Sequence, residues 1–147
     1  MGNRVHVVKK QREYGSKEAF NHQYEQFKTL LRNLTCDVYE EDEGSRNFEM
    51  SCVDYERAMK ILSRIKDALD KDENTDLNKI DLSDCIPVYD IEVPDWCRFD
   101  ISRYDFNDVK DTLKKFPEYS IEEILKIMQD FFDERDKNSD WIQFSSF

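Results

Sequence analysis

Residues 46–52, RNFEMSC, and residues 54–69, DYERAMKILSRIKDAL, decide the fold because the spacing of apolar residues changes between them. In the first stretch Phe48, Met50 and Cys52 alternate with other residues, which is typical of a half-buried β-strand. In the second stretch the apolar residues recur every three or four positions, which predicts an amphipathic helix. Its inward side is expected to contain Tyr55, Ala58, Met59, Leu62, Ile65 and Leu69. A strand followed directly by a helix indicates a sheet covered by helices.

The chain before this pair predicts one strand, one helix and a second strand. Residues 4–9 are rich in valine and favour a strand that ends in the polar stretch 10–15. Ser16 is a candidate cap for the next helix. The apolar side of that helix is expected to contain Phe20, Tyr24, Phe27, Leu30, Leu31 and Leu34. Residues 36–40 then pair with the strand at 46–52 around a polar turn that contains a glycine.

The chain after this pair alternates between polar loops and short elements. Residues 70–84 are predicted to be a polar loop, and residues 88–93, between two prolines, a strand at or near a sheet edge. A short helix is expected within residues 105–116, and the capping box at residues 120–123 begins another. The apolar face of the latter helix contains Ile121, Ile124, Leu125, Met128, Phe131 and Phe132. Residues 141–147 are predicted to form a closing strand.

The order of these elements predicts the fold class. Up to residue 93 it is β-α-β-β-α-β, the order of a ferredoxin-like sandwich. The sequence therefore predicts an α+β fold, a two-layer sandwich with a ferredoxin-like start, a C-terminal helical hairpin and a closing strand. We expect residues 1–147 to form a single domain, because 147 residues is close to the usual size of one domain.

The charge of the chain limits the partners that it can bind. The formal net charge is -11 at pH 7, which repels a phosphate backbone and argues against direct nucleic-acid binding. A protein partner with a basic surface is the natural complement. No apolar run reaches the roughly 18 residues of a membrane helix, so no membrane contact is expected. A cytoplasmic location with reduced thiols is the matching prediction.

One loop resembles the pattern of a calcium site. Residues 70–81 follow a helix and place oxygen-bearing side chains where a calcium loop needs them: Asp70, Asp72, Asn74, Asp76 and Asp81. However, Thr75 stands where the loop usually has glycine, and Asp81 stands where it usually has glutamate. The alternative is a solvated acidic loop. No other cofactor is expected, because the sequence has no glycine-rich phosphate loop.

No catalytic residue follows from the sequence. Its two histidines, His6 and His22, occur without a recognisable nucleophile motif. The four cysteines lack the short spacing of zinc ligands and are expected to be buried small hydrophobic residues.

A cluster of aromatic and basic residues lies in the second half of the chain. Three aromatic residues lie where helical periodicity is absent, and two arginines lie beside them. This composition is typical of a binding hot spot. The predicted partner-binding set is Trp96, Arg98, Phe99, Arg103 and Tyr104. The alternative is that the aromatic members pack in the core.

Two hypotheses for function follow. The first is a non-enzymatic interaction protein, such as an adaptor, an inhibitor or an immunity-type protein, that binds a basic protein surface. The alternative is a small enzyme whose site is assembled from dispersed Asp, Glu and Tyr residues near residues 86–105. A deep polar pocket with shifted pKa values would favour the enzyme, and a flat aromatic and acidic patch would favour binding.

Overall fold

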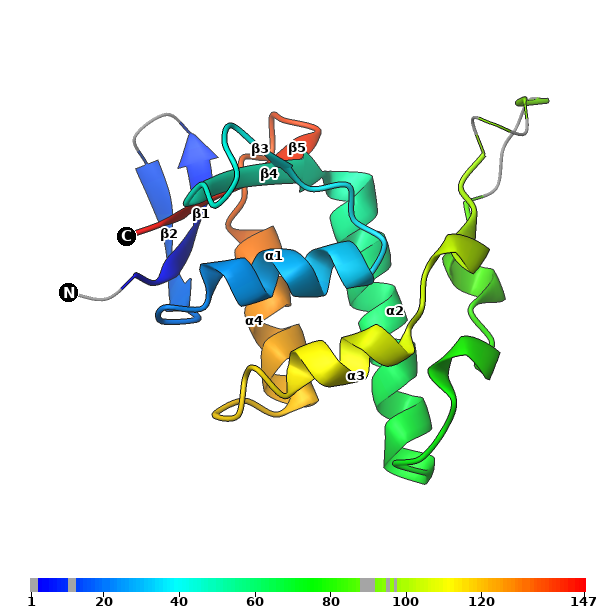
Figure 1. The fold of residues 1–147 in the computed structure, drawn as a ribbon. Coiled ribbons are helices and arrows are strands. Elements are labelled where there is room, and N and C mark those ends of the chain that lie inside the picture. The colour runs from blue at the N-terminus through cyan, green and yellow to red at the C-terminus, as the bar shows by residue number, and fades with distance from the viewer. Residues whose placement is uncertain (1–2, 11–12, 88–91, 95, 97) are drawn as a thin grey trace.

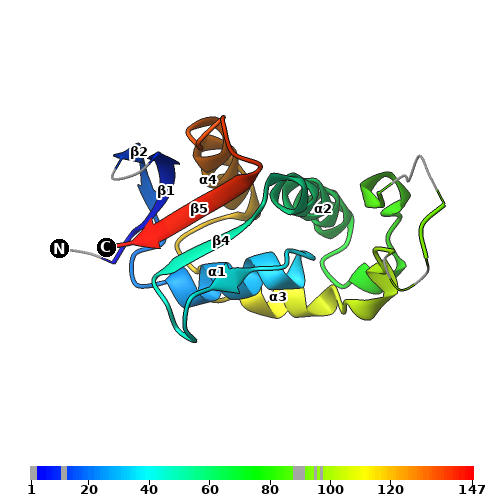
Figure 2. The same ribbon diagram turned by 90° about the horizontal axis from the view of Figure 1, so that it is seen from above.

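The computed structural model describes residues 3–10, 13–87, 92–94, 96 and 98–147. The chain forms two layers, an antiparallel sheet and a set of helices packed against one face of it (Figure 1). In Figure 2, which looks onto the sheet from above, strands β4 and β5 lie in front of the helices. In the part of the chain that the structure describes, no helix covers the other face of the sheet. The predicted two-layer α+β fold is confirmed.

The last strand along the chain lies in the middle of the sheet. The strand order is β2-β1-β5-β4-β3, and every neighbouring pair is antiparallel. Strand β5 therefore joins the hairpin β1-β2 to the hairpin β3-β4. The strands are β1 (Val5–Lys10), β2 (Glu13–Ala19), β3 (Tyr39–Glu40), β4 (Asn47–Ser51) and β5 (Trp141–Ser146).

The start of the chain differs from the predicted ferredoxin-like order. The chain begins β-β-α, because residues 13–19 form β2 where a turn and the beginning of a helix were expected. Ser16 lies within this strand and caps no helix. The sequence of β2, EYGSKEA, is poor in strand-forming residues, so its strand depends on pairing with β1. Helix α1 begins only at Tyr24, and Phe20 is fully buried in the turn before it.

A bulge in β2 is filled by a side chain from the far end of the chain. Opposite the single residue Val7, β2 carries Gly15, Ser16 and Lys17. The carboxylate of Glu134 accepts hydrogen bonds from the N–H of Ser16, the N–H of Lys17 (3.2 Å) and the hydroxyl of Ser16 (3.1 Å). A Cβ at Gly15 would lie 2.9 Å from Val7 and 2.5 Å from Glu134, so a larger residue would have to displace the Glu134 carboxylate and Val7. The bulge and Glu134 together block this edge of the sheet.

Four α-helices form the second layer: α1 (Tyr24–Asn33), α2 (Cys52–Lys71), α3 (Asn107–Leu113) and α4 (Ile121–Asp133). The predicted capping box at Ser120 and Glu123 is confirmed. Helix α3 packs mainly against α1, and α4 packs mainly against α2 (Figure 1). The expected C-terminal hairpin is therefore opened out, because each of its helices covers a different part of the core.

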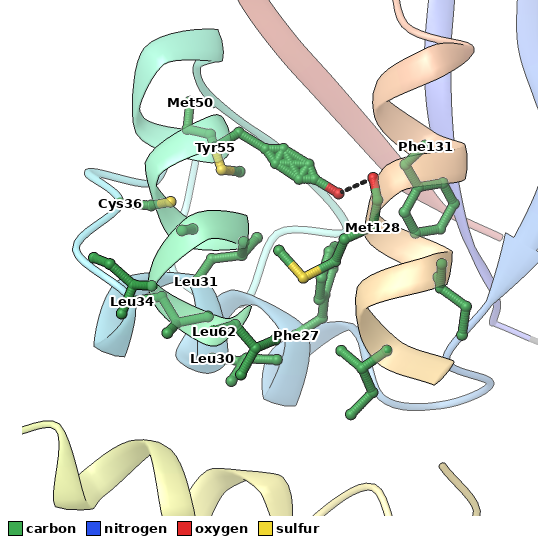
Figure 3. Close-up of a cluster of buried hydrophobic side chains, with 14 of the residues drawn as sticks. Phe27, Leu30, Leu31, Leu34, Cys36, Met50, Tyr55, Leu62, Met128 and Phe131 are labelled. Atoms are coloured by element: carbon green, nitrogen blue, oxygen red, sulfur yellow. Dashed lines mark hydrogen bonds between the residues drawn. The ribbon is translucent and has the colours of Figure 1, made fainter. Parts of the chain in front are cut away.

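The core is built around aromatic residues on the covered face of the sheet. Phe144 of β5 has its ring centroid 5.3 to 5.7 Å from the rings of Phe27, Phe48, Tyr55 and Phe131. The hydroxyl of Tyr55 donates a hydrogen bond of 2.8 Å to the carbonyl of Met128, which links α2 to α4 (Figure 3). Aromatic pairs at these distances add stability beyond their buried area.

The chain between α2 and α3 extends to one side of the two layers (Figure 1). It contains short 3-10 turns at Leu77–Lys79, Ser83–Cys85 and Ile101–Arg103. The predicted strand at 88–93 lies mostly outside the described residues, and Glu92 and Val93 are not in a strand. The described residues contain no helix with the length and apolar character needed to cross a membrane.

Candidate functional site

The uncovered side of the sheet, here called the outer face, carries every second residue of the strands. Register assigns its members: Glu49 lies opposite both Tyr39 and Gln143, and Ser145 lies opposite both His6 and Asn47. The outer face includes His6, Val8, Tyr14, Glu18, Tyr39, Asn47, Glu49, Ser51, Trp141, Gln143, Ser145 and, next to His6, Phe147.

Four exposed aromatic side chains lie on the outer face. The exposed fractions are 42% for Tyr14, 50% for Tyr39, 40% for Trp141 and 51% for Phe147. Tyr39 and Trp141 meet edge to face with centroids 5.6 Å apart near β3. Phe147 stacks on His6 at 4.2 Å and meets Tyr14 at 4.9 Å near β2. Large exposed aromatic rings that are already fixed by neighbours are typical of binding surfaces.

A groove of about 440 Å³ crosses the sheet between these two aromatic clusters. Tyr14 and Tyr39 line its two ends, and polar side chains of β4 and β5 form its floor. On the floor, Gln143 donates a hydrogen bond of 2.9 Å to Glu49. Ser145 donates one of 2.6 Å to Asn47. The floor is thus ordered by its own hydrogen bonds.

The charges that line the groove are all negative. They belong to Glu40, Glu41 and Glu49, and the other lining residues are uncharged. The negative charge of Glu40 is neutralised by cations of the same chain, because Lys28 pairs with it at 2.5 Å and Arg32 at 3.4 Å. No Lys or Arg of the described residues pairs with Glu41 or Glu49, so these two carboxylates give the groove its charge.

A buried lysine holds the β3 end of the groove in place. The side chain of Lys28, on α1, is fully buried, and its ammonium also donates to the carbonyl of Ser45 at 2.8 Å. It lies 2.8 Å from Glu25 as well. The hydrogen bond from Lys28 lowers the pKa of Glu40 below its ordinary value. This network ties α1 to β3 and to the turn before β4.

Burial makes three cysteine thiols and one histidine less reactive. Burial raises the pKa of the Cys36, Cys52 and Cys85 thiols, so each is protonated at neutral pH. Burial also lowers the pKa of His6, which stacks against Phe147. Each shift has desolvation as its main cause, which is the pattern of packed residues rather than of an activated catalytic group.

The structure divides the partner-binding set predicted from the sequence. Trp96 is 84% exposed, and Arg98 and Arg103 are exposed as well. Arg98 donates to the carbonyl of Val93, and Arg103 pairs with Asp100 at 3.7 Å. These side chains face solvent in the extension between α2 and α3.

The other two members of that set are used inside the molecule. Phe99 and Tyr104 are half-buried and stack with centroids 6.1 Å apart, and Tyr104 continues the stack to Phe106. The guanidinium of Arg57 lies 4.3 Å from the Phe99 ring while it binds Asp54 at 2.7 Å. Phe99 and Tyr104 therefore fasten the extension to α2, and burial raises the pKa of Tyr104.

Part of the region proposed for an enzyme site lies outside the described residues, and its described part borders one groove. A groove of about 710 Å³ runs beside residues 101–106 and is lined largely by isoleucine, leucine and aromatic side chains. Asp105 is its one carboxylate among the described residues. Asp105 accepts hydrogen bonds from Asn78 and from the N–H of Asn107, so it holds the start of α3 in place. The enzyme hypothesis stays a prediction from the sequence.

The residues of the predicted calcium loop point to separate partners. Asp70 pairs with Lys66, and Asp76 binds the side chain of Asn107. Asp72 and Asp81 accept hydrogen bonds from backbone N–H groups two residues further on, those of Asn74 and Ser83. Within the described ranges, no three His, Cys, Asp or Glu side chains gather as a metal site. Calcium binding here stays a prediction from the sequence.

Comparison of the chain with protein-family models, with curated proteins and with solved structures found no match. The outer face was not among the predicted sites, although one signal for it is present. In the stretch 141–147, Trp141, Gln143, Ser145 and Phe147 alternate with Ile142, Phe144 and Ser146. This alternation assigns the two aromatic ends of the stretch to the polar side of a strand.

Proposed function

We propose that the chain is a non-enzymatic interaction module that binds a protein partner with a basic surface, and that the outer face is its contact surface. The observation that carries the proposal is the groove between Tyr14 and Tyr39, whose lining charges are all carboxylates. Such an adaptor, inhibitor or immunity-type protein would act in the cytoplasm, in line with the sequence argument.

The chemistry of the groove supports a basic partner. Carboxylates at Glu41 and Glu49 attract Lys and Arg side chains, and the exposed rings offer cation–π contacts to the same groups. On the floor, Gln143 and Ser145 donate hydrogen bonds to neighbouring side chains, so a partner can cover these two donors without leaving them unpaired, while Glu49 keeps one carboxylate oxygen for the partner. Charge complementarity of this kind gives specificity and a fast, salt-dependent association.

The binding hypothesis is also favoured by the state of the reactive groups. The described thiols have raised pKa values and lie on separate elements, and His6 is held neutral under Phe147. A hydrolytic or transfer reaction needs a nucleophile next to a base. The geometry therefore supports recognition better than catalysis.

The test uses the full chain as bait in a lysate of the cells that produce it, followed by binding measurements with the purified partner. Three forms are compared: the unchanged chain, Glu49→Gln on the outer face, and Glu118→Gln, an exposed carboxylate in the turn between α3 and α4. Captured proteins are identified by mass spectrometry and titrated by calorimetry at low and high salt.

We expect a basic partner whose affinity falls with salt and falls further for Glu49→Gln, while Glu118→Gln binds like the unchanged chain. Equal binding by all three forms would exclude the outer face. A partner that binds through an acidic surface would exclude the proposal itself.

A further inference from the structure

We infer that the β3 end of the outer face binds an arginine side chain of the partner, with its guanidinium laid on the ring of Tyr39 and paired with Glu49. This inference rests on the proposed function and names the chemical group that the groove recognises. The subsite lies where β3, β4 and β5 run side by side.

The ring of Tyr39 is held in position before any partner arrives. Its hydroxyl donates a hydrogen bond of 2.7 Å to Asp37, and this bond raises the pKa of Tyr39. Its ring meets Trp141 at an interplanar angle of 70°. Half of the side chain remains exposed. A fixed and exposed ring loses little conformational entropy when a ligand stacks on it.

A carboxylate with spare hydrogen-bonding capacity lies next to this ring. Glu49 is directly opposite Tyr39 in the register of β3 and β4, which places their Cβ atoms about 4.5 to 5.5 Å apart. Its Oε2 accepts the hydrogen bond from Gln143. Its Oε1 accepts no hydrogen bond from any described residue, so it is open to a cation that lies on the ring.

The molecule already contains one arginine in this arrangement. Arg57 lies over the ring of Phe99 at 4.3 Å while its NH2 group binds Asp54 at 2.7 Å. The planar guanidinium can stack on a ring and donate to a carboxylate at the same time, whereas the lysine ammonium is a compact, strongly hydrated charge. The pair of Tyr39 and Glu49 offers the same two contacts to an arginine from outside.

A second copy of the chain fits this face less well. In a two-fold contact the same patch meets itself, so Glu41 and Glu49 of one copy would lie near the same carboxylates of the other. Repulsion of like charges disfavours that contact. A basic segment of a different protein is therefore the occupant.

The test follows the full chain, labelled with ¹⁵N, by NMR during titration with the peptide acetyl-Gly-Ser-Arg-Ser-Gly-amide. Two matched peptides carry lysine or citrulline in place of arginine; citrulline keeps the shape and removes the charge. The chain has 2 tryptophans, so its indole N–H signals report on Trp141 at the subsite and on Trp96 in the extension.

We expect the Trp141 indole signal and the side-chain amide of Gln143 to shift and saturate with the arginine peptide, while the Trp96 signal stays in place. Binding should be about two- to fivefold weaker for lysine and absent for citrulline. The inference is wrong if the Trp141 signal does not move at about 20 mM peptide, in the millimolar range expected for one side chain. It is equally wrong if lysine binds as well as arginine.

Variants separate this subsite from general attraction to an acidic protein. Tyr39→Ala and Glu49→Gln should each weaken the arginine peptide about two- to fivefold, and Glu118→Gln should leave it unchanged. The dispersion of the NMR signals shows whether each variant is folded. If Tyr39→Ala does not fold, Glu49→Gln alone tests the subsite.

Failure of this inference differs from failure of the proposed function. One outcome is that the partner binds the unchanged chain more tightly than it binds the Glu49→Gln variant while the peptide does not shift the Trp141 signal. In that case the proposed function is kept and the arginine subsite is rejected. If partner binding does not depend on the outer face, the function falls.

Discussion

The two faces of the sheet are made from alternate residues of the same strands, and they differ in what covers them. In β5, Phe144 points to the helices and touches four aromatic rings, while its neighbour Gln143 points to the groove. In β4, Phe48 and Glu49 repeat the contrast. The covered face supplies most of the free energy of folding, and the outer face keeps its aromatic rings available for contact. Substitutions in neighbouring residues should therefore have very different effects.

The largest effect is expected for Phe144→Ala. Removing this ring from the centre of the aromatic core should lower the free energy of unfolding by about 3–5 kcal/mol, because the cavity is surrounded on all sides and cannot collapse easily. Urea unfolding followed by circular dichroism measures the loss. The neighbouring change Gln143→Ala should cost less than about 0.5 kcal/mol. Similar losses for both would mean that the two faces do not differ as described.

Lys28→Met removes a fully buried cation from the covered side. The change removes the ammonium that binds Glu40 and the carbonyl of Ser45, and we expect a loss of about 1.5–3 kcal/mol in the free energy of unfolding at neutral pH. The same change should loosen the β3 end of the groove, which hydrogen exchange of residues 39–46 would report.

The pH dependence of stability provides a second measurement on this variant. Because Lys28 lowers the pKa of Glu40 in the folded state, the unfolded chain binds the proton more readily. The contribution of Glu40 is present above its unfolded pKa and is lost as the pH falls through its folded pKa. Acid unfolding of Lys28→Met should therefore depend less steeply on pH in this range. An unchanged slope would show that the Lys28–Glu40 contact does not stabilise the fold.

Glu134→Ala tests the edge strand β2, where Glu134 fills the bulge. The loss of three hydrogen bonds to the β2 bulge should lower the free energy of unfolding by about 1 kcal/mol, since the freed N–H groups can bind water. An unblocked edge should also favour pairing with other chains, which size-exclusion chromatography detects as a concentration-dependent shift. Glu118→Gln is the control for the loss of one negative charge.

The smallest effect on stability is expected for Glu49→Gln. The side chain is on the outer face and keeps a hydrogen-bond acceptor for Gln143, so the free energy of unfolding should change by less than about 0.5 kcal/mol. Together with weaker partner binding, this result would separate the role of the outer face from that of the core. A loss of unfolding free energy comparable to that of Phe144→Ala would contradict the different roles assigned to the outer face and the core.

The elements with strong local signals could be predicted from the sequence. Three signals lie in residues that are close together in the sequence: the change of period between β4 and α2, the capping box of α4 and the alternation in β5. Each of the elements that these signals predict is present. Strand β2 could not be predicted, because EYGSKEA is a strand only where β1 lies beside it and Glu134 fills its bulge. The free energy that forms β2 comes from contacts that are distant in sequence.

The candidate site was harder to predict for the same reason. The sequence shows which residues of β5 share a face, but the helices that cover one face and leave the other open are placed by the tertiary fold. The aromatic residues at 96–104 were expected to bind a partner as a group. Two of them contact Arg57 and Phe106, which no local pattern indicates, and the role of the group in binding stays a prediction.

The central position of β5 also sets the order in which the sheet can be assembled during synthesis. Strands β1 to β4 leave the ribosome first, as two hairpins with nothing to join them. At about 5–20 residues per second, the roughly 90 residues between β4 and β5 take on the order of ten seconds to translate. During that time the inner edges of β1 and β4 are both unpaired, which is when a nascent chain is most exposed to wrong partners. A single late strand then completes both halves at once.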